Sequence, residues 1–147
     1  LMTVVEAKML YCEKLIDGKA MAAEVRAEVK AQAQEIAREY GVTPGLAVVI
    51  AGSRPDSQTY VRNKVKACEE CDIKSIKHDL TDEATNDEIL ALLHTLNCDP
   101  AVHAILVQLP LPDHIDETKI LDAISADKDV DGFQPLVMGR LAMRGRD

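Results

Sequence analysis

Three stretches of the chain have the apolar pattern of β-strands. Residues 46–51 (LAVVIA) and 104–107 (AILV) are unbroken apolar runs, and prolines flank the second run on both sides. Short runs with such boundaries fit strands covered on both faces better than helices, and such strands belong to parallel sheets flanked by helices. Residues 74–80 (KSIKHDL) alternate like a more exposed strand. We expect 104–107 to be the central strand.

Apolar residues at helical spacing fill the segments between these runs. Residues 19–40 form the longest such segment, and Gly41 follows it as a typical helix stop. We expect a second helix over about 58–71, with Asp56 or Ser57 as its N-cap. The remaining expected helices are 88–96, which follows a capping sequence at 85–88, and 115–124.

The alternation of helices and strands predicts the fold class. It indicates an α/β fold, a mostly parallel sheet with flanking helices and right-handed crossovers, in a single domain. A length of 147 residues and a hydrophobic content of 47% are sufficient for one core. Because the chain has no Trp and one Phe, that core must be mostly aliphatic.

Charge and composition argue against several classes of partner. The net charge is −8 and no block of Lys or Arg occurs, which disfavours a nucleic-acid partner. No apolar run reaches membrane-spanning length, so no membrane partner is expected. The first ten residues lack a basic leader, and a signal peptide is not expected. Four cysteines without such a signal suggest reduced thiols in a cytoplasmic protein.

Cys68 and Cys71 form a CxxC pair, which could be half of a metal site or a redox pair. There is no second CxxC, and Cys12 and Cys98 are distant in sequence. The pair also lies in a helical pattern. We therefore expect packing thiols and no metal site.

Polar residues that could bind a ligand or take part in catalysis follow the predicted strands. Tyr60 and Lys64 are four positions apart and project from one helix face, close to the end of the preceding strand. Gln108 stands where the run 104–107 ends, and ligands of open α/β sheets bind at the carboxyl ends of strands. Asp129 and Asp131 belong to a charged loop, KDVDG.

Each of these features has an ordinary structural explanation. Helix lysines are usually solvated, tyrosines usually pack, and DxDG usually forms a turn or binds a cation. The spacing Tyr-x-x-x-Lys also occurs in short-chain dehydrogenases, beside a bound dinucleotide. That interpretation requires a glycine-rich turn between strand and helix, and the seven glycines of this chain are too scattered to make one.

Three motifs together resemble a known family. The segments SQTYVRNKVKAC, ILVQLPLPDH and DKDVDGFQP, in this order and at this spacing, resemble the catalytic domain of bifunctional methylenetetrahydrofolate dehydrogenase/methenyltetrahydrofolate cyclohydrolases. The resemblance implies a catalytic domain at 15–141, an N-terminal extension at 1–14, and at 142–147 the start of a linker to a cofactor domain that is absent from the chain. It implies that folate is the substrate and that the NADP site of the full-length family is not present here.

The resemblance also assigns roles to individual residues. Lys64 matches the catalytic acid/base, Gln108 supports that lysine, and Asp131 holds the pterin ring. Tyr60 packs on the folate. The substrate-binding set that we take from the resemblance is Tyr60, Ser57, Asp131 and Pro110, and the catalytic set is Lys64, Gln108 and Asp131.

The residue types suit cyclohydrolase chemistry. Hydrolysis of a methenyl bridge needs a group that accepts a proton and then returns it. A free lysine, with a pKa of about 10.4, is a poor base at neutral pH, and burial under a flat ligand lowers that pKa. A neutral amide such as Gln108 can orient the amine without raising its pKa as a carboxylate would. A carboxylate such as Asp131 can accept paired N–H bonds from an aminopyrimidine edge.

Departures from the family pattern leave a second hypothesis open. After DVDGF the usual His-Pro-x-Asn is replaced by Gln134, Pro135, Leu136 and Val137. This change and the absent cofactor domain favour a non-catalytic folate-binding or regulatory module, or an orphan fragment. The intact Tyr60, Lys64, Gln108 and Asp131 favour an enzyme. Without the returning helix and cofactor domain on which the family's catalytic domain packs, we expect an exposed apolar patch, and with it a homodimer or aggregation-prone behaviour.

Overall fold

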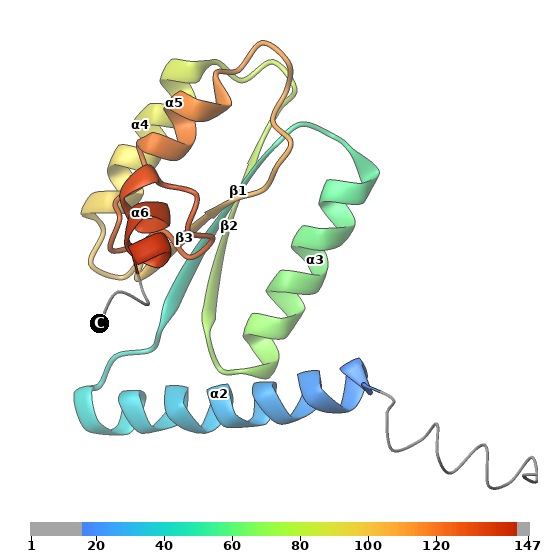
Figure 1. The fold of residues 1–147 in the computed structure, drawn as a ribbon, viewed down its shortest axis with the longest axis vertical. Helices are drawn as coiled ribbons and strands as arrows, with labels where there is room; N and C mark the ends of the chain where they lie inside the picture. The colour runs from blue at the N-terminus through green and yellow to red at the C-terminus, as the bar shows by residue number, and fades with distance from the viewer. Residues whose placement is uncertain (1–15, 144–147) are drawn as a thin grey trace, which may run out of the picture.

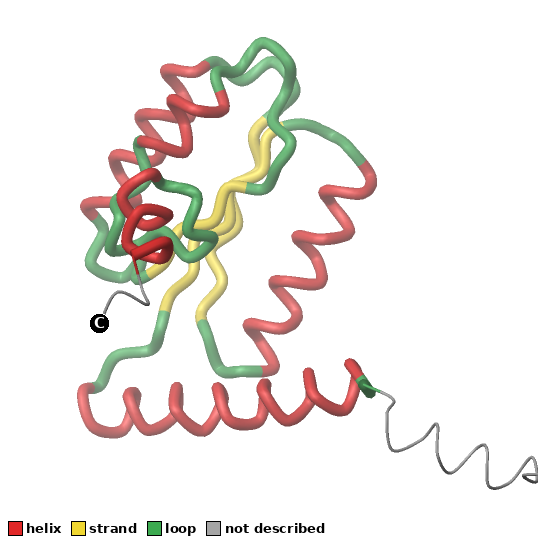
Figure 2. Tube along the Cα trace, viewed as in Figure 1, coloured by secondary structure: helices red, strands yellow, loops and turns green. Residues whose placement is uncertain are grey.

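The computed structural model describes residues 16–143 and has three layers. Three parallel strands form a sheet in the order β2-β1-β3. Figure 1 shows α3 on one face of this sheet, α4 and α5 on the other, and α2 across one end; Figure 2 shows the loops that join them. Within these residues no helix is long and apolar enough to cross a membrane. The elements are α2 (Gly18–Tyr40), β1 (Gly45–Ala51), α3 (Pro55–Glu70), β2 (Lys74–Leu80), α4 (Asn86–Cys98), β3 (Ala104–Val107), α5 (Glu117–Asp122) and α6 (Pro135–Met143).

The predicted α/β fold is confirmed, but the central strand is β1 and not β3. Strand β1 pairs in parallel with both neighbours, whereas β3 pairs along one side. The other edge of β3 is covered by a loop, because Ile105 N–H donates to Lys128 O at 2.8 Å and Ile105 forms a bridge with Asp129. The faces of β3 are covered by helices, because Ile105 and Val107 pack in the cluster with α4 and α5 and Leu106 packs in the cluster with α3. The strand is therefore apolar on both faces although it lies at an edge, and this explains why its sequence suggested a central position.

The two faces of the sheet contribute to separate clusters of core residues. On one face, α4 and α5 pack on β1 and β3; on the other, α3 covers the sheet mainly through Val61. The aliphatic core expected from the composition is thus confirmed. The larger cluster includes Ala47, Val49, Ile89, Leu93, Leu96, Ile105, Val107, Ile120 and Ile124, and the smaller consists of Val48, Ile50, Val61 and Leu106.

Helix α2 has the predicted ends, but most of its apolar stripe is not buried. The Asp17 carboxylate accepts hydrogen bonds from the first-turn backbone, and Gly41 closes the helix with φ +66°. Along the helix only Ala33 is buried, while Met21 is 54% exposed and Val25 57% exposed. The amphipathic pattern that predicted the helix therefore does not correspond to a buried face in the described chain.

Polar contacts attach α2 to the turn between α3 and β2. Arg26 Nε lies 3.1 Å from Glu70 Oε2, and Gln34 Nε2 donates to Asp72 Oδ2 at 2.6 Å. Lys30 Nζ lies 3.4 Å from the other oxygen of Asp72. Asp72 has φ +57°, a conformation that aspartate tolerates better than most residues. A single exposed contact of this kind contributes little to the free energy of unfolding, so the attachment of α2 depends on several of them together.

Helix boundaries differ from the expectation at two places. Helix α3 starts at Pro55, ahead of the expected start, so Asp56 and Ser57 lie in its first turn and neither is the N-cap. Arg54 is the N-cap and makes no side-chain cap hydrogen bond. Helix α6 was not among the expected helices. The expected capped start of α4 is confirmed, with a reciprocal capping box between Thr85 and Glu88.

Candidate active site

Lys64 and Gln108 meet across the gap between α3 and the carboxyl end of β3. Lys64 Nζ donates a hydrogen bond to Gln108 Oε1 at 3.2 Å, and both side chains are partly buried. Gln108 is itself fixed, because its backbone N–H donates to Val49 O and its Nε2 donates to Leu109 O, each at 2.8 Å. With its amide N–H turned to the backbone, the side chain presents its oxygen to the lysine.

Asp131 lies close enough to Lys64 for the two charges to interact. Burial raises the pKa of the Asp131 carboxyl above its ordinary value of 3.8. The positive charge of Lys64 opposes this rise in pKa, and the negative charge of Asp129 adds to it. A carboxylate, an ammonium and an amide from three different segments therefore gather at one edge of the sheet.

Asp129 holds the loop that carries Asp131. Its two carboxylate oxygens accept hydrogen bonds from Gly132 N–H at 3.0 Å and from Gln134 N–H at 2.9 Å. Gly132 has φ +70°, which suits glycine in this tight loop. Sequence reasoning named Asp129 only as a neighbour of Asp131. The turn-forming tendency of DxDG was the signal for the role that it has here.

Lys128 joins the same loop to the end of α4. Its Nζ donates to Leu96 O at 2.9 Å and to Asp99 O at 2.8 Å, which are carbonyls at the carboxyl end of that helix. A cation at this position satisfies carbonyls that a helix end leaves without partners and interacts favourably with the helix dipole. The loop is thereby fixed on both sides, by β3 and by α4.

The other predicted site residues differ in how far they are exposed to solvent. Tyr60 is 62% exposed, one helical turn before Lys64 on the same side of α3. Pro110 is exposed and follows a cis peptide bond with Leu109. Ser57, by contrast, is only 4% exposed, although it belongs to the first turn of α3. The structure therefore brings Lys64, Gln108 and Asp131 together and leaves Ser57 away from the open surface.

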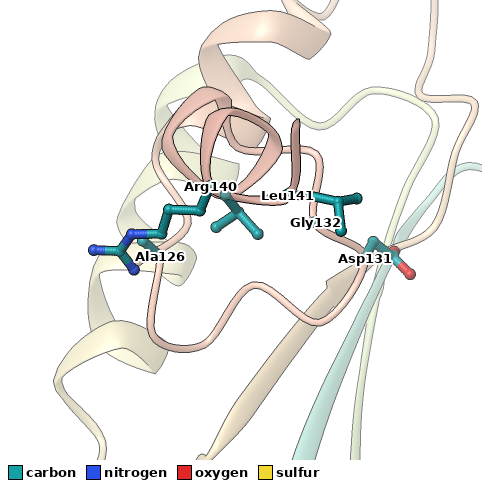
Figure 3. Close-up of a pocket in the computed structure, with 6 residues that line it drawn as sticks. Ala126, Asp131, Gly132, Arg140 and Leu141 are labelled. Atoms are coloured by element: carbon teal, nitrogen blue, oxygen red, sulfur yellow. The ribbon is translucent and has the colours of Figure 1, made fainter. Parts of the chain in front are cut away.

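A cavity of about 310 Å³ lies between the Asp131 loop and α6. Figure 3 shows Asp131 and Arg140 at opposite sides of it, with the Asp131 carboxylate directed toward the strands and the guanidinium directed away. Val137, where the resemblance leads us to expect an asparagine, lines this cavity, and its Cγ1 is 3.6 Å from where a Gly132 side chain would begin. The lining residues are Ala126, Asp131, Gly132, Val137, Arg140 and Leu141.

The other departure residue, Gln134, lies beside the same loop. Its backbone N–H is bonded to Asp129, but among residues 16–143 its side-chain oxygen is buried without a hydrogen-bond partner. A buried polar atom without a partner costs stability. Both departures therefore lie next to the loop that holds Asp131.

The CxxC cysteines are packed inside the domain. Cys68 and Cys71 are buried, and the Cys71 thiol lies 3.6 Å from Arg26 O. Burial raises the pKa of the Cys68 thiol above its ordinary value, which makes it a poorer nucleophile. In the part of the chain that the structure describes, no three His, Cys, Asp or Glu residues gather as a metal site.

The turn between β1 and α3 does not fit a dinucleotide. Gly52 is its only glycine, and a side-chain carbon there would lie 2.7 Å from Asp82 Oδ1. The Asp82 carboxylate thus packs against the one glycine of this turn. Helix α3 also starts with Pro55, which has no N–H to offer a phosphate.

Comparison with known proteins agrees with this arrangement. Residues 16–131 match the family described as tetrahydrofolate dehydrogenase/cyclohydrolase, catalytic domain. The chain belongs to this family. It is 54% identical over 137 residues to the bifunctional protein FolD 2 of Arabidopsis thaliana, an alignment that spans 93% of this chain and 46% of that protein.

Solved structures of the tetrahydrofolate dehydrogenase/cyclohydrolase family have the same fold. The bifunctional FolD enzyme of Campylobacter jejuni aligns with a TM-score of 0.84 at 50% identity, over 86% of this chain and 45% of that one. The Trypanosoma brucei enzyme, solved with NADP and an inhibitor, aligns with a TM-score of 0.87 at 39% identity, over 90% and 45% of the two chains. The chain thus spans about half the length of the relatives that it matches.

Proposed function

We propose that this chain binds tetrahydrofolate derivatives and carries the cyclohydrolase chemistry that interconverts the 5,10-methenyl and 10-formyl forms. The observation that carries the proposal is the hydrogen bond of 3.2 Å between Lys64 Nζ and Gln108 Oε1, with Asp131 nearby. An amine held by a neutral amide at the end of a buried strand has no evident structural need. Membership of the folate family supplies the chemical class.

In the proposed reaction Lys64 moves one proton twice. The neutral amine accepts a proton from water while the water oxygen bonds to the methenyl carbon. The resulting ammonium then returns the proton to the ring nitrogen as the bond between that nitrogen and the former methenyl carbon breaks. The new hydroxyl releases its own proton to solvent and becomes the formyl group on the other nitrogen. General acid–base catalysis by a positioned group contributes about a hundred- to ten-thousandfold in rate.

The remaining site residues would bind and orient the folate. Asp131 accepts N–H bonds from the aminopyrimidine edge of the pterin, and the exposed Tyr60 ring covers an apolar face of the ligand. Pro110 contributes surface beside Gln108. Ser57 belongs to the first turn of α3 and is buried, so its contribution would be less direct than the substrate contact that the resemblance implies.

Oxidation of methylenetetrahydrofolate would need a further domain. The Trypanosoma brucei relative was solved with NADP, but the turn between β1 and α3 of this chain does not fit a dinucleotide. We therefore assign the NADP-dependent dehydrogenase step to this catalytic domain only in the company of a cofactor domain. In that step the residues of this chain would bind and orient the folate.

A non-catalytic folate-binding module is the second candidate, and one observation favours it. Val137 lines the cavity beside Asp131, at a position where the resemblance implies an asparagine. The side-chain oxygen of Gln134 is buried without a hydrogen-bond partner among the described residues. If these changes displace the pterin, folate could still bind without turnover.

The deciding experiment measures hydrolysis of methenyltetrahydrofolate by the purified chain. The loss of the substrate's absorbance monitors the reaction, and calorimetry measures the affinity for folate. Hydrolysis above the uncatalysed rate, abolished in Lys64→Met, supports the enzyme. Folate binding without hydrolysis supports the module. Absence of both contradicts both.

We also propose that the chain associates as a homodimer through α2. Met21, Val25, Ile36 and Tyr40 are exposed on this helix, and apolar side chains at this density on one helix favour burial against a partner. A second copy of the chain supplies an identical surface, as two-fold dimers require. Sedimentation of the wild type and of Val25→Glu tests this, since the charge should produce a monomer.

The partners and compartment that we propose follow the sequence. The net charge of −8 disfavours nucleic acid, and we expect no membrane partner and no metal. The free thiols of Cys68, Cys71 and Cys98 suit a reducing compartment, which we take to be the cytoplasm. Relatives named as chloroplastic and mitochondrial show that the family also occurs in organelles. Localisation of a tagged protein tests the assignment.

A further inference from the structure

Helix α3, which carries Tyr60 and Lys64, has no cap of its own. Its N-cap residue Arg54 makes no side-chain cap hydrogen bond, whereas the Asp17, Thr85 and Asp116 side chains cap α2, α4 and α5. Along α3 only Ser57, Val61 and Cys68 are buried. Neither its end nor its narrow apolar face fixes its position along the sheet strongly, so another contact must contribute.

That contact is a clamp between the loop before α3 and the loop after β2. The Asp82 carboxylate accepts two hydrogen bonds from Ser53, one from its backbone N–H at 3.1 Å and one from its Oγ at 2.7 Å. Gly52 N–H donates to Leu80 O at 3.0 Å in the same place. The hydrogen bonds from Ser53 lower the pKa of Asp82, so the carboxylate is charged at neutral pH.

Gly52 makes this close approach possible. With φ +98° it adopts a conformation that favours glycine, and Asp82 Oδ1 occupies the space that a side chain would need. The side chain of Gln58, in the first turns of α3, donates to Gly52 O at 3.4 Å. The clamp is therefore joined to α3 through the hydrogen bond between Gln58 and Gly52.

The loop after β2 is a firm base for the clamp. The capping box of Thr85 and Glu88 closes it, and Ala84 within it is buried. It is also tied to the loop after β3, because His114 Nε2 lies 2.9 Å from Ala84 O and Asp116 N–H donates to Asn86 Oδ1 at 2.9 Å. Asp82 thus projects from a segment that is fixed at several points.

We propose that Asp82 is a positioning residue, which through Ser53 sets where α3 begins and so places Lys64 against Gln108. Asp82 does not touch the reacting atoms. The inference rests on the proposed function for its kinetic consequence, but its structural consequence, the position and local stability of α3, is independent of any activity.

The expected kinetic result is a loss of rate that exceeds the loss of folate affinity. Asp82→Ala should lower kcat of methenyltetrahydrofolate hydrolysis by roughly tenfold to a hundredfold, because small misplacements of an acid/base reduce catalysis steeply. Folate affinity should fall by less than kcat, since Tyr60 shifts with α3 whereas Asp131 lies on a different loop. Asp82→Asn keeps an acceptor for Ser53 N–H and should restore most of the rate.

Two comparisons separate positioning from general destabilisation. Asp17→Ala removes two hydrogen bonds at the N-cap of α2, away from the Asp82 loop, and serves as the matched control, which should lower Tm without lowering kcat. Ser53→Ala should add little to Asp82→Ala in the double variant, because the two residues act through one contact. Equal losses of kcat in Asp82→Ala and Asp17→Ala would overturn the proposal.

Amide hydrogen exchange supplies the readout that needs no activity. Asp82→Ala should speed exchange at residues 58–62 in α3 and leave the first turn of α2 unchanged, whereas Asp17→Ala should do the reverse. Unchanged exchange in α3 overturns the clamp. Faster exchange in α3 with an unchanged kcat overturns the proposed link between the clamp and the position of Lys64. A wild type that neither hydrolyses nor binds folate refutes the proposed function, and the exchange data then judge the clamp alone.

Discussion

Lys64 Nζ lies 3.2 Å from Gln108 Oε1, and this pair connects the middle of α3 to the end of β3. The two residues are 44 positions apart in the sequence, so their contact depends on the whole β1-α3-β2-α4-β3 arrangement. The amide restricts where the amine can move while leaving both of its protonation states possible. That combination is suited to proton transfer and less suited to a structural ion pair.

Replacing Lys64 by Met tests the proton carrier. Met keeps an aliphatic side chain, so the free energy of unfolding should change by less than about 0.5 kcal/mol at this partly buried position. The rate of methenyltetrahydrofolate hydrolysis should fall by at least about a hundred- to ten-thousandfold. Single-turnover absorbance measurements with wild type and Lys64→Met give the ratio. Equal rates would mean that Lys64 is only a solvated helix residue.

Replacing Gln108 by Ala tests orientation separately from proton transfer. The variant loses the acceptor for Lys64 but keeps the amine, so the hydrolysis rate should fall by less than in Lys64→Met. The backbone bond from residue 108 to Val49 O remains, so β3 should keep its position. If Gln108→Ala is as inactive as Lys64→Met, Gln108 takes part in the chemistry more directly than we propose.

Replacing Asp131 by Asn tests the pterin contact. The amide has no charge and one acceptor fewer, so folate affinity should weaken more than the rate at saturating substrate. Isothermal titration with tetrahydrofolate at neutral pH measures the first effect, and steady-state kinetics the second. Lys66→Met, on the exposed side of α3, is a control that should change neither.

The raised pKa of Asp131 also predicts a pH dependence of stability. Because burial raises this pKa, the ionised carboxylate destabilises the folded chain at neutral pH. Asp131 is exposed and solvent screens its charge, so Asp131→Asn should unfold at only a slightly higher urea concentration. The advantage should shrink as the pH falls through the raised pKa, and vanish below the ordinary value of 3.8. Urea midpoints at several pH values check this, and a constant difference would contradict it.

The purified chain should not oxidise methylenetetrahydrofolate with NADP. The Asp82 carboxylate packs against Gly52 in the turn between β1 and α3, and the helix after this turn starts with a proline. Absorbance of the reduced cofactor during incubation with substrate gives a direct measurement. Saturable NADP-dependent oxidation by this chain alone would show that the cofactor binds elsewhere on the domain.

Thiol labelling should separate the cysteines by burial. Cys98 is exposed and should react with an alkylating reagent first, while the buried Cys68 and Cys71 should react only when the domain opens. The raised pKa of Cys68 adds to its protection. Mass spectrometry of digested samples, with Cys12→Ser to remove the thiol that lies outside the described residues, gives the order. Early labelling of Cys68 would contradict the packing role.

The sequence predicted the fold class well because its strands and caps are local signals. The apolar runs at β1 and β3, the Gly41 stop and the capping box at Thr85 each depend on a few neighbouring residues. The position of β3 at an edge was not accessible in this way. It depends on a loop near Lys128, which covers the strand but comes from a later part of the chain, beyond α5.

The candidate site was predictable in part for similar reasons. Helical spacing placed Tyr60 and Lys64 on one side of α3, and the end of an apolar run marked Gln108. Sequence spacing could not show that Ser57 is buried, because that follows from where α3 begins. Nor could it identify the Ser53–Asp82 contact, whose partners are 29 positions apart and carry no motif. The boundaries expected at residue 14 and residue 142 lie outside or at the limit of the described residues.

The two ends of the molecule can change independently. Helix α2 crosses the amino ends of the strands, while Lys64 and Gln108 belong to the carboxyl end of β3 (Figure 1). Substitutions on the exposed side of α2 could therefore alter assembly without reaching the proton-transfer pair, and substitutions at the pair could alter turnover without altering assembly. For protein engineering this separates two properties that are often coupled: α2 offers a place for fusions, tethers or new interfaces at a distance from the chemistry.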